Sequence, residues 1–157
     1  MSYQIPQRTI DALRQYTDVV IDAVGIPCTL HIPNESSYLE AEREDIFRKP
    51  ADYIHDVFTC KIWIEWSPST YRLKKAGIYT EESLPMLVWF PNTITDSDGN
   101  PVEADIGLRS YFSIDAQFIP AKYTKAEEFE IVNVALRGMH DKVALKAFAA
   151  APRRVKK

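Results

Sequence analysis

The first 25 residues carry the clearest pattern of apolar and polar positions in the chain. Apolar or β-branched side chains recur there at alternating steps of three and four: Ile10, Leu13, Thr17, Val20 and Val24. This period predicts an amphipathic helix over 7–24 whose apolar face packs on a sheet. Pro6 suits the start of the helix, Gly25 suits a left-handed cap at its end, and Pro27 prevents continuation.

After Gly25 the pattern changes to a period of two, which is typical of strands. The segment 28–32 alternates in this way, and a longer segment carries a full apolar face of Phe58, Cys60, Ile62, Ile64 and Trp66. The run 85–91 is apolar throughout and bounded by prolines. It predicts a strand covered on both faces, by the core and by a partner or a helix. Residues 69–76 predict a short helix that ends at Gly77.

The second half of the chain continues with short strand signals. Residues 111–114 predict a strand, and 128–136 predict a bulged or twisted one, because the apolar positions change parity after Ile131. Residues 96–100 predict a chain reversal at Asp-Gly rather than a calcium loop, which would require a glutamate further on. Residues 143–150 fit a helix and a strand equally well.

These elements predict a mainly β (α+β) fold, a small antiparallel β-barrel or sandwich with an N-terminal amphipathic helix. We expect five to seven short strands, because the strand–helix alternation of a parallel sheet is missing. The predicted organisation is a single domain over 1–157, with the helix at 7–24, a β-rich core at 26–150, extended loops at 33–56 and 91–110, and a basic tail at 151–157.

Composition narrows the function. The 157 residues are 46% hydrophobic and 26% charged, with a net charge of −3, which suits one ordinary core and no global affinity for nucleic acid. Five glycines against ten prolines argue against the Gly-rich loops of nucleotide enzymes. The first ten residues lack a secretory pattern, and the longest apolar run, 86–90, is too short for a membrane span. We therefore expect a protein made in the cytosol, with no membrane partner.

The candidate chemistry points away from an enzyme. His31, His55 and His140 are scattered, so we predict no metal and no cofactor. Cys28 and Cys60 are interpreted as buried free thiols rather than a disulfide or a reactive site. A dyad of Cys60 with His140, assembled in space, stays a minor alternative.

Two charged segments suggest contacts with partners. The cationic tail residues Arg153, Arg154, Lys156 and Lys157 can contact phosphates without reading bases, or can simply keep a chain end soluble. The stretch 34–50 is too polar for a core and predicts an exposed excursion. The candidate interface residues are Glu40, Glu42, Glu44, Trp89 and Phe90.

Five segments taken in order carry a resemblance to a known class. They are GIPCTLHIP at 25–33, AGIYTEESLPMLVWFP at 76–91, SYFSI at 110–114, EFEIV at 128–132 and APRR at 151–154. This order, behind a short helix, resembles small neck proteins of tailed bacteriophages, which are the head-completion, head–tail connector and collar components.

The resemblance implies a structural virion protein that acts by assembly and not by catalysis. Its implied partners are further copies of itself in a ring, the portal or adaptor and tail proteins, and phage DNA passing non-specifically through the channel. It implies assembly in the host cytoplasm and residence in the virion, with the loops 33–56 and 91–110 as arms. A baseplate component or other small tail-associated binding module with a similar barrel is the alternative.

Overall fold

The computed structural model describes residues 6–34, 54–80, 85–123, 126–139 and 142–153, with 136–139 and 142–146 described by their backbone alone. Its helices are α1 (Gln7–Val24), α3 (Thr70–Lys75) and the 3-10 turns η2 (Ala116–Phe118) and η3 (Ala121–Tyr123). Its strands are β1 (Ile26–Pro33), β2 (His55–Glu65), β3 (Met86–Trp89), β4 (Thr93–Thr95), β5 (Pro101–Glu103), β6 (Tyr111–Ile114), β7 (Phe129–Met139) and β8 (Lys142–Pro152).

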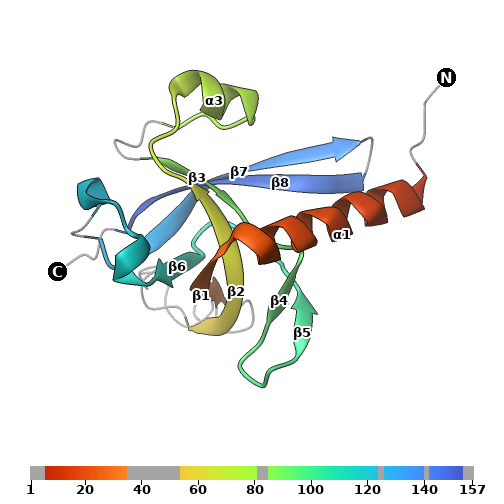
Figure 1. Cartoon of the computed structure of the whole chain (residues 1–157), viewed down its shortest axis with the longest axis horizontal. Helices are drawn as coiled ribbons and strands as arrows, with labels where there is room; N and C mark the ends of the chain where they lie inside the picture. The colour runs from red at the N-terminus through yellow and green to blue at the C-terminus, as the bar shows by residue number, and fades with distance from the viewer. Residues whose placement is uncertain (1–5, 35–53, 81–84, 124–125, 140–141, 154–157) are drawn as a thin grey trace, which may run out of the picture.

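The strands form a closed antiparallel barrel, as the sequence predicts. The order β1-β6-β7-β8-β3-β2 closes on itself because β1 also pairs with β2, with Ile26 opposite Ile62 and Pro33 opposite His55. The outer strands β4 and β5 extend the sheet from β2 as a hairpin. In Figure 1 this hairpin and α3 lie at opposite ends of the molecule, with α1 crossing the barrel between them.

The barrel interior is filled by the side chains that the period-two pattern selects. Leu30 and Ile62 are fully buried, Ile64 is nearly so, and the outward positions Thr59 and Lys61 are exposed. The proline-bounded strand β3 is covered on both faces: Met86 and Val88 belong to the barrel core, and Leu87 packs in a second cluster with Leu73 of α3. The predicted second cover of this strand is therefore the short helix.

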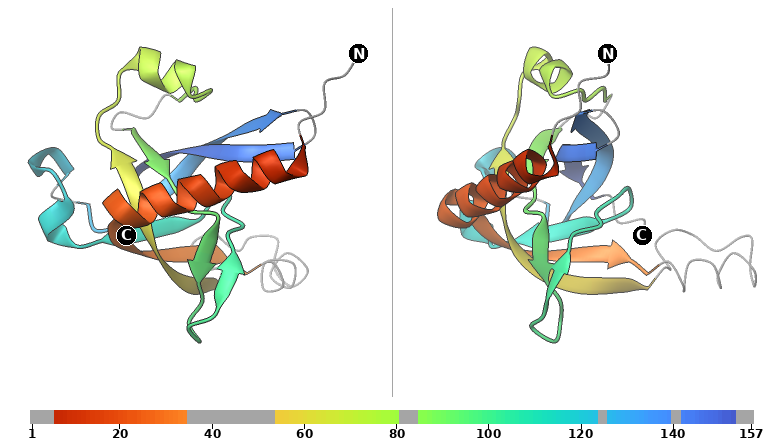
Figure 2. Two further views of the ribbon diagram at one scale, coloured as in Figure 1. Left: turned by 45° about the vertical axis from the view of Figure 1, so that its right-hand side comes forward. Right: turned by 90° about the vertical axis from the view of Figure 1, so that its right-hand side faces the viewer.

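The long hairpin of β7 and β8 tests two predictions, the bulge in 128–136 and the ambiguous segment 143–150. A register shift between Ile131 and Asn133 confirms the bulge that the change of parity predicts. The ambiguous segment 143–150 is a strand, because β8 pairs with β3 on one side and β7 on the other. Figures 1 and 2 show the far end of this hairpin extending past the barrel beside the N-terminal half of α1.

The limits of α1 match the predicted 7–24, but its cap does not, and its buried face matches only in part. Gly25 has φ −75° rather than a left-handed conformation, and a Cβ there would lie 2.4 Å from the Ile21 carbonyl oxygen. Glycine is thus required by close approach and not by a positive φ. Ile10 and Ile21 are the buried side chains, whereas Val20 and Val24 of the predicted stripe are exposed.

The predicted short helix and turn are both present. Ser69 caps α3 by accepting a hydrogen bond from the Arg72 amide at 3.1 Å, and Gly77 ends it with φ 84°. Asp96 Oδ1 accepts from the amides of Asp98 and Asn100, which fixes the reversal between β4 and β5. No described helix has the length and apolar character needed to cross a membrane.

The predicted loops need correction. The expected extended loop 91–110 contains β4 and β5, because Thr93–Thr95 and Pro101–Glu103 pair with each other. In the expected loop 33–56, Pro33, His55 and Asp56 belong to the β1–β2 ladder. Residues 35–53, including most of the exposed excursion and arm expected there, lie outside the described residues.

Candidate functional site

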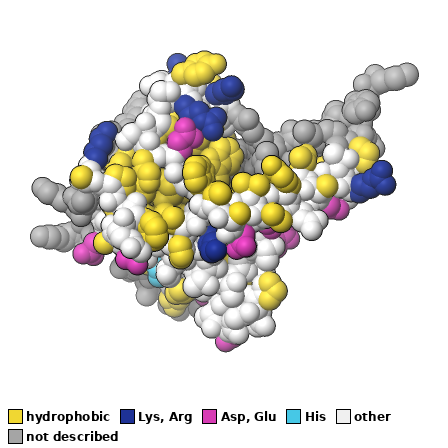
Figure 3. All heavy atoms as spheres, viewed as in Figure 1, with side chains coloured by type: hydrophobic (Ala, Val, Ile, Leu, Met, Phe, Trp, Pro, Cys, Tyr) yellow, Lys and Arg dark blue, Asp and Glu magenta, His cyan; other side chains and the backbone are white. Residues whose placement is uncertain are grey.

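An exposed row of apolar side chains runs along the outer side of α1. The row consists of Tyr16, Val19, Val20 and Val24, which are 69%, 60%, 38% and 53% exposed, and we call it the apolar helix row. Their spacing places them on one helix face. Figure 3 shows hydrophobic side chains gathered over α1 and over the sheet between α1 and α3. Large contiguous apolar patches on a protein surface commonly bind partners, so this row is a candidate interaction surface.

The opposite side of α1 is fixed to the barrel by polar contacts. Asp18 Oδ1 accepts hydrogen bonds from the Asn92 amide at 2.6 Å and from Asn92 Nδ2 at 3.1 Å. Asn92 Nδ2 also donates to the Arg14 carbonyl at 3.2 Å, and Arg14 pairs with Glu103 at 2.8 Å. These contacts set the rotation of the helix, so that the apolar helix row faces outward.

Two tryptophans extend apolar surface onto the sheet. Trp63 of β2 and Trp89 of β3 are directly opposite in the ladder, so their side chains leave the same face. Trp63 is 46% exposed, and Trp89 is half-buried against the cluster under α3. The predicted interface residue Trp89 is thus partly accessible.

The structure corrects the expectation for Phe90. Its side chain is only 7% exposed and packs edge-on against Phe112 and Phe148 in the barrel core. The change of parity between Trp89 and Phe90 explains the difference, because neighbouring residues of an extended chain point to opposite faces. Phe90 therefore stabilises the core rather than an interface. Glu40, Glu42 and Glu44 lie outside the described residues.

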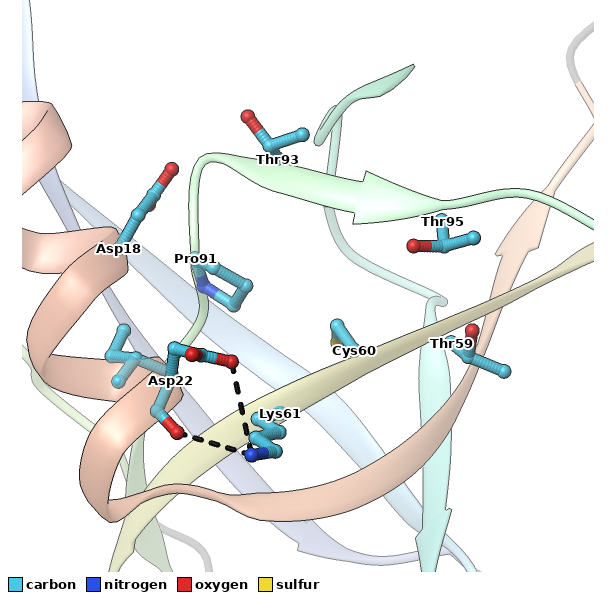
Figure 4. A pocket seen from close by; sticks show the side chains of 9 residues that line it. Asp18, Asp22, Thr59, Cys60, Lys61, Pro91, Thr93 and Thr95 are labelled. Atoms are coloured by element: carbon cyan, nitrogen blue, oxygen red, sulfur yellow. Dashed lines mark hydrogen bonds and ion pairs between the residues drawn. The ribbon is translucent and has the colours of Figure 1, made fainter. Parts of the chain in front are cut away.

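A groove of about 440 Å³ lies between α1, β2 and β4 (Figure 4). Its lining residues are Asp18, Ile21, Asp22, Thr59, Cys60, Lys61, Pro91, Thr93 and Thr95. Lys61 Nζ donates to the Asp22 carbonyl at 3.1 Å and lies 3.7 Å from Asp22 Oδ1. Across the described part of the chain, no three His, Cys, Asp or Glu side chains are grouped as metal ligands.

Cys60, which lines this groove, lies next to the other cysteine of the chain, and the sequence did not predict this contact. Its Sγ lies 3.4 Å from Sγ of Cys28, and both thiols are free. Cys28 is buried, as expected, but Cys60 is only half-buried. Their proximity depends on the register of β1 against β2, for which the separate strand patterns carried no signal.

A second polar cluster surrounds Tyr111 and includes one of the predicted tail cations. The guanidinium carbon of Arg153 lies 3.7 Å from the Tyr111 ring centre, and Arg153 Nη1 donates to Glu128 Oε2 at 2.7 Å. His31 stacks on the same tyrosine at 4.4 Å, and His55 meets it edge-on at 5.0 Å. Arg153 is thus engaged within the fold. The other predicted cations, Arg154, Lys156 and Lys157, lie outside the described residues.

The comparisons with known proteins add no relative. No protein-family model, curated protein or solved structure matches the chain. Its function is therefore inferred from its residues and their arrangement.

Proposed function

We propose that the protein is a structural virion protein of a tailed bacteriophage, a ring-forming subunit of the neck that connects the head portal to the tail. It acts by assembly and not by catalysis, and it enters the virion from the host cytoplasm. The order of segments that resembles neck proteins motivates the proposal. The observation that carries it is the apolar helix row on α1, 38–69% exposed on a helix whose other side is fixed to the barrel.

The fixed orientation of α1 favours association between copies. Because the row is held rigidly, it loses little conformational entropy on binding. Most of the free energy gained by burying its apolar surface therefore contributes to affinity. A helix face that docks on a different surface of the next copy makes a head-to-tail contact, which closes into a ring when the rotation allows. The β7–β8 hairpin, which extends past the barrel, offers an arm toward a neighbouring copy or the adjoining portal or tail protein.

The charge distribution supports a channel through which DNA slides. A groove of about 550 Å³ beside the β4–β5 hairpin carries four carboxylates, those of Asp56, Asp96, Glu103 and Asp105. Acidic side chains repel phosphates, so a ring with this surface toward its axis lets DNA pass without holding it. Arg154, Lys156 and Lys157 are proposed as non-specific phosphate contacts at the chain end.

Paired helix variants test the proposal. Val19→Lys places a charge in the apolar helix row, whereas Gln7→Lys places the same charge at an exposed position on another side of α1, beside Asp11. We expect Val19→Lys to weaken self-association by roughly tenfold or more. The lysine would be buried in the contact between copies, where it loses its hydration without gaining an acidic partner. Light scattering across a concentration series measures the effect.

The control distinguishes association from folding. Gln7→Lys should associate like the unmodified chain, and all three proteins should unfold at similar temperatures because both positions are exposed. Equal association of the two variants would contradict a role for the apolar helix row.

A baseplate component or other small tail-associated module is the second candidate. The same apolar helix row would then dock on a tail protein rather than on another copy. A protein that stays monomeric, binds a purified tail or baseplate fraction and ignores the portal would favour this alternative.

A further inference from the structure

The two cysteines face each other across the seam that closes the barrel. Cys28 of β1 and Cys60 of β2 are directly opposite in the antiparallel ladder, and their sulfur atoms are 3.4 Å apart. Directly opposite residues of an antiparallel pair have Cα atoms about 4.5 or about 5.5 Å apart, depending on the type of pair. A disulfide requires a Cα separation of about 4.4–6.8 Å and a sulfur separation of about 2.05 Å. Small rotations of the two side chains, with little movement of the strands, therefore bring the sulfurs into bonding range.

The two thiols differ in their access to solvent. Cys28 is 6% exposed, whereas Cys60 is half-buried and borders the groove between α1 and β4. Figure 4 shows the Cys60 side chain on the groove side of β2. The contact with Cys60, together with burial, raises the pKa of the Cys28 thiol. Cys60 is therefore the thiol that a reagent in the groove meets first.

We propose that Cys28 and Cys60 form a reversible redox-modification site, in which a small disulfide such as oxidised glutathione converts the two thiols into a disulfide across the β1–β2 seam. The site is independent of the apolar helix row, and nothing in the proposed assembly requires it.

The reaction balances as two exchanges. Cys60 loses its proton to solvent, and its thiolate attacks one sulfur of glutathione disulfide, expelling a glutathione thiolate and leaving a mixed disulfide on Cys60. Cys28 then loses its proton, attacks the Cys60 sulfur and expels the second glutathione thiolate. The released thiolates take up the two protons. The cysteines are oxidised, and one glutathione disulfide is reduced to two glutathione thiols.

The location gives the bond a structural effect. It would connect the strands whose pairing closes the barrel and would close a chain loop over 29–59. Disulfides across loops of this length stabilise mainly by restricting the unfolded chain. The moment at which this disulfide forms would rest on the proposed function. A virion assembles in the reducing cytoplasm and then leaves it, so the bond would form after release.

The experiment treats the full chain, without denaturant, with glutathione disulfide. We expect a monomer lighter by two hydrogen atoms and a non-reduced peptide digest in which the Cys28 and Cys60 peptides are linked. Dithiothreitol should restore both thiols. The melting temperature should rise by roughly 5–10 °C on oxidation and return on reduction. A chain that stays unmodified, stops at the mixed disulfide, forms intermolecular dimers or gains no stability would overturn the proposal.

Single substitutions test the order of attack. Cys28→Ser should accumulate glutathione on Cys60, because the second thiol is missing. Cys60→Ser should be modified at least tenfold more slowly, because the remaining thiol is buried. Faster modification of Cys60→Ser than of Cys28→Ser would overturn this order. Should Cys28→Ser not fold, Cys28→Ala replaces it, and the peptide digest of the unmodified chain still tests the bond itself.

Discussion

At the scale of single residues, His31 is placed where its charge is unfavourable. Its ring stacks on Tyr111 at 4.4 Å and an interplanar angle of 10°. Burial lowers the pKa of His31; Glu128 opposes this effect, and His55 and Arg153 add to it. The folded protein therefore prefers the neutral imidazole, so this histidine links stability to pH.

We expect stability to fall as the pH drops through the titration of His31. The unfolded chain takes up this proton near pH 6.5, before the folded protein does, so the contribution is complete above about pH 6.5 and is lost as the pH falls through the lower folded pKa. His31→Phe keeps a ring against Tyr111 but takes up no proton. Urea midpoints at about pH 7.5 and about pH 5 should therefore differ less for His31→Phe than for the unmodified chain. An equal difference would show that other groups carry the pH dependence.

At the scale of elements, the end of β8 separates a structural cation from the candidate DNA contacts. Arg153 is paired with Glu128 and packed on Tyr111. Arg153→Ala should lower the free energy of unfolding by about 1–2 kcal/mol, because Glu128 then loses its partner. Arg8→Ala, which removes an exposed arginine from α1, should change it by less than about 0.5 kcal/mol. Urea denaturation measures both.

Deletion of residues 154–157 tests the other three tail cations, Arg154, Lys156 and Lys157, separately from Arg153. If these cations contact DNA, the deletion should weaken DNA binding most at low salt while leaving the unfolding midpoint unchanged. DNA binding that is unaffected at every salt concentration would make the tail a solubility feature.

Local pattern predicted most elements but not the rotation of α1. The predicted stripe and the observed buried face share Ile10, but the buried face turns toward Ile21 and leaves Val20 and Val24 exposed. The contact of Asp18 with Asn92 and the close approach of Gly25 to β2 select the side that carries Ile21. Both constraints join residues far apart in sequence, and no local period contains them.

At the scale of the whole molecule, strand order and barrel closure decide the features that the sequence did not predict, which are the type of β fold and the contacts between distant residues. The strand signals predicted a barrel or a sandwich, and the pairing of β1 with both β2 and β6 selects the barrel. This closure brings Cys28 to Cys60, and the neighbouring positions of β6, β7 and β8 bring Arg153 to Tyr111. These neighbours follow from register and strand order, so they could not be predicted from alternation within single strands.

The proposed function requires that copies of the protein assemble into a ring. Three features favour a protein that assembles with further copies of itself and with adjoining proteins. They are the outward apolar row on a fixed helix, the acidic groove and the extended β7–β8 hairpin. Each of these features lies on the outside of the barrel.

Negative-stain electron microscopy of the full chain, at concentrations where light scattering detects association, tests this claim most directly. We expect closed rings with a central opening, formed by the unmodified chain and by Gln7→Lys but not by Val19→Lys. A protein that stays a monomer at every concentration, alone and with portal or tail proteins, would contradict it.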